Sequence, residues 1–125
     1  MLANAKVVPT LPAKDMERAK KFYQQTLGLE VAEENPGGVR FKCADGTQLA
    51  VYPSSYAGTN QATAAEFEVS DIETDMAELR NKGVKFEEYD IPDLKTKNGV
   101  ASFGDDKAAW FKDTEGNILS IFQRG

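Results

Sequence analysis

The chain carries the same succession of strands, helix and hairpin twice. The first helical stretch follows Asp15 and ends at Gly28, and the second follows Asp71 and ends at Gly83. The strand-like runs that flank these helices cover residues 5–11, 29–32, 64–69 and 84–89. A unit repeated along a sequence must form equivalent elements in each copy. The repeat therefore predicts an α+β fold of two βαβββ modules, at residues 5–52 and 63–124, joined by a linker at 53–62.

Each module alone has too little apolar surface to fold well, so residues 1–125 are predicted to form a single domain. Apolar residues recur at helical spacing in both helical stretches. These residues are Met16, Ala19, Tyr23 and Leu27 in the first, and Ile72, Met76 and Leu79 in the second. Ser70 and Glu73 have the spacing of a capping box at the start of the second helix. A glycine at the end of each helix is suited to a C-terminal cap.

The closing hairpins of the two modules, residues 41–52 and 111–122, are the most similar segments. They share Phe, Lys, Gly and Leu at matched positions, and Gly46 and Gly116 are predicted to form the turns. The offset between copies is 71 − 15 = 56 residues at the helices and 111 − 41 = 70 at the hairpins, so the second copy contains an insertion. This insertion, at residues 90–104, is expected to be either a lid or pocket wall or a tolerated surface loop.

Side-chain alternation along the strands separates an aliphatic face from an open face. The aliphatic face suits packing under the helices, whereas the open face mixes small, polar, acidic and aromatic side chains. The polar and aromatic residues predicted on the open face are Thr10, Gln48, Tyr52, Glu66, Glu68, Ser120 and Phe122. Aromatic residues with a few polar groups are the usual lining of a small-molecule site.

The composition excludes several kinds of chemistry. The chain has no histidine and one cysteine, so it can form neither a His-based catalytic triad nor a His or Cys metal site. A metal would need carboxylate and carbonyl ligands. The net charge of −5 argues against a nucleic-acid partner. The sequence predicts no membrane segment and no signal peptide, and together with the single cysteine this favours the cytoplasm.

The helix and hairpin motifs of the two modules resemble those of the vicinal oxygen chelate superfamily. This superfamily includes glyoxalase I, extradiol dioxygenases, and fosfomycin- and bleomycin-resistance proteins. The resemblance covers almost the whole chain. It is carried by residues 14–19, 22–23, 27–29, 69–73 and 82–84, and above all by the Trp110–Leu119 segment with its Asp-Thr-Glu-Gly-Asn turn. It implies a curved mixed sheet around an open cleft, with the helices on its outer face.

Metal-dependent members of this superfamily hold the metal at four symmetric strand positions, usually with His, Gln or Glu. The matching positions in this sequence are Val8, Ala50, Ala64 and Ser120. Only Ser120 carries an oxygen in its side chain. The resemblance is therefore to the metal-free branch, and no cofactor is expected.

Metal-free members are often binding proteins that sequester antibiotics, and they are commonly homodimers. The resemblance thus implies binding of a small organic ligand, either an antibiotic or another natural product. The ligand-binding residues expected are Thr10, Gln48, Tyr52, Glu66, Glu68, Trp110, Ser120 and Phe122. The glutamates would meet a cationic ligand, and Tyr52, Trp110 and Phe122 would stack on a planar one.

Two alternatives stay open. A metal-independent lyase, isomerase or epimerase would use Glu66, or Tyr89 with Asp90, as base and acid. A domain whose open face only makes dimer contacts would need neither ligand nor catalyst. The two modules can also pair within one chain or be exchanged between two chains.

Overall fold

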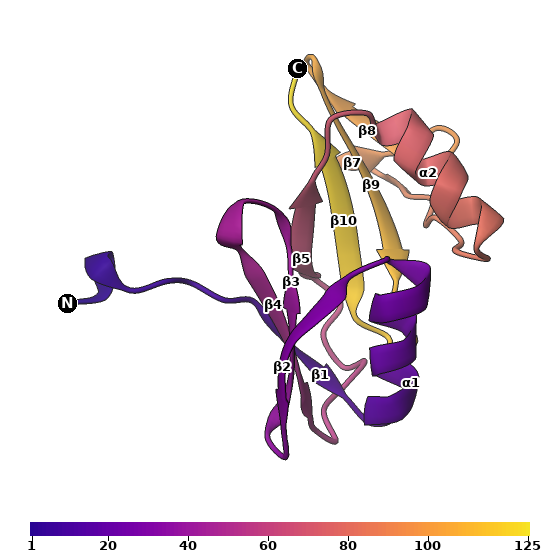
Figure 1. The fold of residues 1–125 in the computed structure, drawn as a ribbon. Helices are drawn as coiled ribbons and strands as arrows, with labels where there is room; N and C mark the ends of the chain where they lie inside the picture. Colours follow the sequence, from indigo (N-terminus) through magenta and orange to yellow (C-terminus); the bar gives the residue numbers. More distant parts are fainter. The chain divides into compact units, whose positions relative to one another are not determined.

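Backbone hydrogen bonds join the strands into two four-stranded sheets and one two-stranded sheet in the computed structural model, which describes residues 1–125. Each four-stranded sheet belongs to one of two compact units, Met1–Ala57 (unit 1) and Gly58–Gly125 (unit 2). Each unit also contains one α-helix, and both sheets are mixed, which confirms the predicted α+β class with two βαβββ modules. Figure 1 shows the elements of both units. No helix is both long enough and apolar enough to cross a membrane.

Unit 1 has the strand order β1-β4-β3-β2, with β1 parallel to β4 and the other pairs antiparallel. Its elements are η1 (Leu2–Asn4), β1 (Thr10–Ala13), α1 (Met16–Lys21), η2 (Phe22–Thr26), β2 (Glu30–Asn35), β3 (Gly38–Lys42), η3 (Ala44–Gly46) and β4 (Gln48–Pro53). The prediction of a strand over 5–11 is wrong for residues 5–9, because β1 begins at Thr10 and continues to Ala13. Residues before β1 reach outward from the sheet, with Val7 fully exposed (Figure 1).

The first predicted helix is an α-helix that continues as a π-helix. Asp15 caps it, because its carboxylate accepts a hydrogen bond of 3.1 Å from the Arg18 N–H. The π-helix η2 is closed by the Leu27 N–H, which donates to the Phe22 carbonyl. Gly28 follows with a φ of +73°, so the predicted end of the helix is confirmed.

The core of unit 1 forms between this helix and the sheet. Tyr23 from η2 stacks on Phe41 from β3, with ring centroids 5.5 Å apart, and both side chains are fully buried. Leu49 and Val51 of β4 are buried beside them. Burial of these aromatic and aliphatic side chains is the main stabilising contribution.

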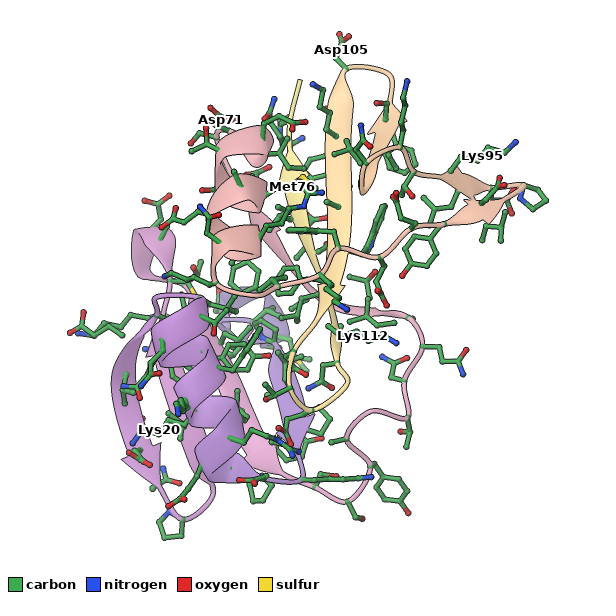
Figure 2. All side chains as sticks on the ribbon, turned by 90° about the vertical axis from the view of Figure 1, so that its right-hand side faces the viewer. Lys20, Asp71, Met76, Lys95, Asp105 and Lys112 are labelled. Atoms are coloured by element: carbon green, nitrogen blue, oxygen red, sulfur yellow. The ribbon has the colours of Figure 1, made fainter.

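Unit 2 repeats this arrangement with the strand order β5-β10-β9-β8, in which β5 is parallel to β10. Its elements are β5 (Thr63–Glu68), α2 (Ile72–Asn81), β6 (Asp90–Ile91), β7 (Leu94–Lys95), β8 (Val100–Phe103), β9 (Asp106–Lys112) and β10 (Ile118–Gln123). Ile72 and Met76 of α2 are fully buried, and Figure 2 shows Met76 on the strand side of the helix.

The predicted capping box at Ser70 and Glu73 is wrong by one residue. Asp71 is the cap of α2, and its carboxylate accepts hydrogen bonds from the N–H and the hydroxyl of Thr74. These bonds lower the pKa of Asp71. The cap therefore matches Asp15 of the first module, 56 residues earlier in the sequence.

The predicted strand over 84–89 is also wrong, because only Phe86 forms a bridge, with Phe111 of β9. The insertion at 90–104 has more regular secondary structure than a loop, since it contains the small hairpin β6–β7 and the strand β8. β8 pairs with the first half of β9. It therefore occupies the sheet edge along which residues 84–89 do not form a strand.

Candidate ligand-binding face

Three of the predicted ligand-binding residues form one row across the sheet of unit 2. Ser120 on β10 is the register partner of Glu66 on β5 and of Trp110 on β9. Partners in register point to the same face, and neighbouring strands are about 4.8 Å apart. We call Glu66, Ser120 and Trp110 the central row. Ser120 is buried, Trp110 is half-buried and Glu66 is exposed.

The indole of Trp110 lies across the sheet. Its Nε1 donates a hydrogen bond of 3.1 Å to Oγ1 of Thr63, which is on β5, beyond the intervening strand β10. One side of the ring therefore covers β10, and the ring forms an aromatic platform on the open face. Such a platform can stack on a planar ligand.

Tyr89 stands next to this platform. The rings of Tyr89 and Trp110 are perpendicular, with an interplanar angle of 89° and centroids 5.6 Å apart. The segment that carries Tyr89 runs along β9, where the Glu87 N–H donates to the Trp110 carbonyl at 2.8 Å. Tyr89 thus extends the central row beyond β9.

Charged neighbours and burial set the protonation state of Tyr89. Burial raises the pKa of its phenol, the negative charge of Glu87 raises it further, and Lys112 opposes both. Nζ of Lys112, labelled in Figure 2, lies 3.5 Å from Oε1 of Glu87. Tyr89 is therefore a neutral hydrogen-bond donor over the physiological pH range.

The two predicted acidic residues have different surroundings. Oε1 of Glu68 accepts hydrogen bonds of 3.1 and 2.9 Å from Nε and Nη2 of Arg124. The same guanidinium lies 5.8 Å from the centre of the Phe122 ring. Glu68 and Phe122 therefore already have an internal cation, whereas Glu66 is the acid of this face that makes no ion pair. Arg124 was not predicted for this face, because it lies just beyond β10 and strand alternation does not reach it.

The predicted residues of unit 1 share a face of its own sheet. Thr10 is in register with Ala50 and Tyr52 with Pro12, while Gln48 is in register with Lys42. Thr10 and Tyr52 are exposed and Gln48 is half-buried. The row of unit 1 that corresponds to the central row consists of Thr10, Ala50 and Arg40. It has a guanidinium where unit 2 has the indole.

The four positions that the family resemblance assigned to a metal do not fit a divalent cation. Val8, Ala50 and Ala64 have no donor atom in their side chains, and Ser120 offers a single hydroxyl. No group of three or more His, Cys, Asp or Glu side chains is arranged to hold a metal ion.

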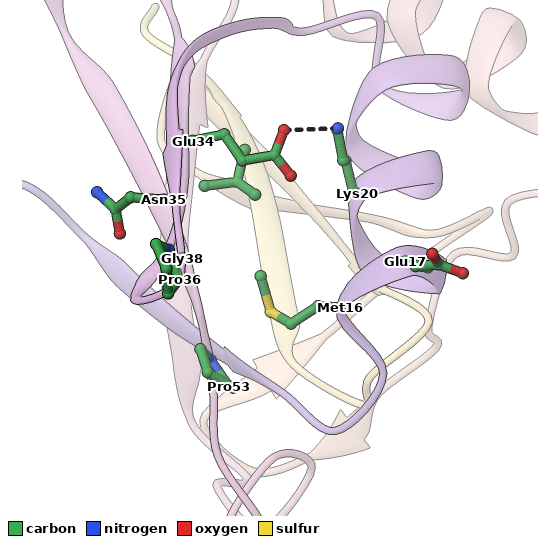
Figure 3. Close-up of a pocket in the computed structure, with 9 residues that line it drawn as sticks. Met16, Glu17, Lys20, Glu34, Asn35, Pro36, Gly38 and Pro53 are labelled. Atoms are coloured by element: carbon green, nitrogen blue, oxygen red, sulfur yellow. Dashed lines mark hydrogen bonds and ion pairs between the residues drawn. The ribbon is translucent and has the colours of Figure 1, made fainter.

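Two cavities, one in each unit, lie away from the predicted residues. A cavity of about 240 Å³ in unit 1 has the ion pair between Lys20 and Glu34, at 2.7 Å, in its wall (Figure 3). A larger and more open hollow of about 720 Å³ in unit 2 lies beside Arg80 and Phe86. None of the predicted ligand-binding residues lines either one.

The sequence is similar to that of known proteins over most of its length. Residues 6–121 match the family model described as Glyoxalase/Bleomycin resistance protein/Dioxygenase superfamily. The uncharacterized protein YurT of Bacillus subtilis (strain 168) is 28% identical over 135 aligned residues, covering 94% of this chain and 98% of YurT.

Two solved structures share the fold. TnmS3, an antibiotic binding protein from Streptomyces sp. CB03234, superposes with a TM-score of 0.74 and 23% identity, and all of both chains is covered. Lactoylglutathione lyase from Agrobacterium tumefaciens superposes with a TM-score of 0.72 and 18% identity, covering 96% of this chain and 93% of the lyase. At these identities the likeness concerns the fold alone.

Proposed function

The chain belongs to the glyoxalase/bleomycin resistance protein/dioxygenase superfamily, and we propose that it binds a small planar organic molecule on the open face of unit 2 without a catalytic metal. The observation that carries this proposal is the indole of Trp110 lying across β10 in the central row. A flat aromatic ring held by a hydrogen bond loses little conformational freedom when a ligand stacks on it.

The charges on this face favour a cationic ligand. Glu66, at the far end of the central row, has no internal cation, in contrast to Glu68. Two strand spacings place its Cα about 10 Å from that of Trp110. A planar ring on Trp110 with a cationic group directed toward Glu66 would use both ends of the row.

The biological role that we propose is the capture of an antibiotic or another natural product. This role is supported by TnmS3, which shares the fold and is an antibiotic binding protein. We further propose that the protein acts in the cytoplasm and that it is a homodimer. Light scattering of the purified protein would test the homodimer.

Fluorescence titration tests the binding proposal directly, because Trp110 is the single tryptophan of the chain. Proflavine, a planar cation, is compared with a neutral anthraquinone, each with divalent metal and with chelator. We expect saturable quenching of Trp110, unchanged by chelator and weakened by Glu66→Gln for proflavine only. The matched control is Glu33→Gln, an exposed glutamate of unit 1. The proposal fails when neither compound quenches Trp110 or raises the melting temperature, or when quenching requires the metal.

A second candidate function, a metal-independent lyase, isomerase or epimerase, has one specific observation in its favour. The phenol of Tyr89, which keeps its proton because burial raises its pKa, stands at one end of a row that carries the free carboxylate of Glu66 at the other end. Asp90, the other predicted acid, lies on the exposed hairpin β6–β7. Conversion of a bound compound, followed by NMR and abolished by Glu66→Gln, would distinguish this function from capture.

A further inference from the structure

The hydroxyl of Thr96 connects the inserted segment to Tyr89. It accepts a hydrogen bond of 2.8 Å from the Tyr89 N–H and donates one of 2.7 Å to Oε1 of Glu88. The Thr96 N–H donates to the Tyr89 carbonyl at 2.9 Å. The same Glu88 oxygen accepts from the Gly99 N–H at 2.6 Å. We call Glu88, Thr96 and Gly99 the Thr96 clamp.

A second set of contacts holds the middle of the insertion, at residues 98–99, against the helix. Arg80 of α2 donates from Nη2 to the Asn98 carbonyl at 3.0 Å, and its guanidinium lies 5.1 Å from the centre of the Phe86 ring. Gly99 is buried and has a φ of +81°. A Cβ there would lie 3.0 Å from Cβ of Phe86 and 3.1 Å from Cε of Met76. The turn at 98–99 therefore packs closely on α2.

The backbone at Tyr89 is held between β9 and the hairpin β6–β7, in which Asp90 pairs with Lys95. Upstream of it, the segment is joined to β9 by the bridge at Phe86 and by the Glu87 N–H. Both backbone polar groups of Tyr89 bind Thr96. The orientation of the Tyr89 ring at the edge of Trp110 consequently depends on a residue within the insertion.

We infer that the insertion at 90–104 is a wall of the ligand site, and that Thr96 is a positioning residue which holds Tyr89 perpendicular to the Trp110 platform. This inference rests on the function proposed above. Tyr89 closes the central row on the side of β9, so a planar group stacked on Trp110 must end at the Tyr89 ring. The phenol then offers a hydrogen bond to an acceptor on the edge of that group. The insertion thereby selects ligands by the length and edge chemistry of their planar part.

The test uses four variants of the full chain. Thr96→Val removes the hydroxyl while keeping the shape, and Thr96→Ser restores the hydroxyl. Tyr89→Leu removes the aromatic wall itself. Thr47→Val is the matched control, because the Thr47 hydroxyl also donates within a turn, to the Ala44 carbonyl, but belongs to unit 1. Far-UV circular dichroism establishes that each variant is folded.

The first measurement needs no ligand. Acrylamide quenching and the emission maximum of Trp110 report on the position of Tyr89. We expect Thr96→Val and Tyr89→Leu to show stronger quenching and a red-shifted emission, and Thr96→Ser and Thr47→Val to match the wild type. A folded Thr96→Val protein with wild-type emission and quenching overturns the inference, even if its melting temperature is lower.

The second measurement is the Kd of proflavine. Loss of an aligned aromatic contact corresponds to about a two- to tenfold increase in Kd, expected for Thr96→Val and reversed in Thr96→Ser. Equal Kd values for the wild type and Thr96→Val overturn the role of the insertion as a wall. If the wild type binds neither proflavine nor the anthraquinone, the proposed function and this wall role fail together, while the emission of Trp110 still decides whether Thr96 positions Tyr89.

Discussion

Nε1 of Trp110 donates a hydrogen bond of 3.1 Å to Oγ1 of Thr63, although the two residues are on strands β9 and β5 and β10 lies between them. This bond fixes the direction of the indole over the open face. Because Tyr89 stands perpendicular to the same ring, Trp110 is held from two sides. The hydrogen bond to Thr63 and the ring contact with Tyr89 can be tested separately.

Thr63→Val should release the indole while leaving the fold intact. The loss of one exposed hydrogen bond should lower the free energy of unfolding by about 0.5–1 kcal/mol. The near-ultraviolet circular dichroism of Trp110 should weaken, since the ring gains freedom. Thr63→Ser, which keeps the hydroxyl, should retain the wild-type spectrum. An unchanged spectrum in the valine variant would show that the hydrogen bond does not orient the ring.

Much of this face was predictable from the sequence. Alternation along β5 and β10 correctly placed Glu66, Glu68, Ser120 and Phe122 on one face, because the period of a strand is fixed by its backbone. The ends of both helices were predictable from Gly28 and Gly83, which have positive φ values. These are local properties that the chain encodes within a few residues.

The predictions failed where a distant segment decided the structure. Residues 84–89 have the composition of a strand, but β8 from the insertion competes for the edge of β9 and leaves a single bridge at Phe86. Ser70 has the right spacing for a cap, but the carboxylate of Asp71 reaches both donors of Thr74. Arg124 was missed because its contact with Glu68 joins residues 56 positions apart.

Replacing Arg124 with Gln should make the face more attractive to cations. The substitution frees the carboxylate of Glu68 and removes a positive charge from beside Phe122. Since an exposed ion pair contributes about 0.2–1 kcal/mol, the Kd of proflavine should fall by about 1.5- to fivefold. The Kd of the neutral anthraquinone should stay constant. A proflavine affinity that is unchanged or lower would exclude Glu68 from the binding face.

The raised pKa of Tyr89 predicts a loss of stability at high pH. A tyrosine whose pKa is higher in the folded state holds its proton more tightly there than in the unfolded chain, where the pKa is about 10. Its contribution to stability is complete below pH 10 and disappears as the pH rises through the folded-state pKa. Urea unfolding from pH 8 to 11 should therefore show a steeper decline for the wild type than for Tyr89→Phe. Parallel curves would mean that the phenol is not desolvated.

Substitution of two glycines of the insertion distinguishes the stability cost of backbone strain from that of overpacking. Gly104 has a φ of +63° with nothing within 4 Å of an added Cβ, whereas Gly99 has a φ of +81° and a Cβ there would crowd Phe86 and Met76. Gly104→Ala should cost about 1–2 kcal/mol from the left-handed backbone alone. Gly99→Ala should cost a further 1–3 kcal/mol, roughly, from overpacking against α2. Because Gly99 also binds Glu88, this variant alone should shift the emission of Trp110. Equal stability losses and unchanged emission in both variants would contradict close docking of the 98–99 turn on α2.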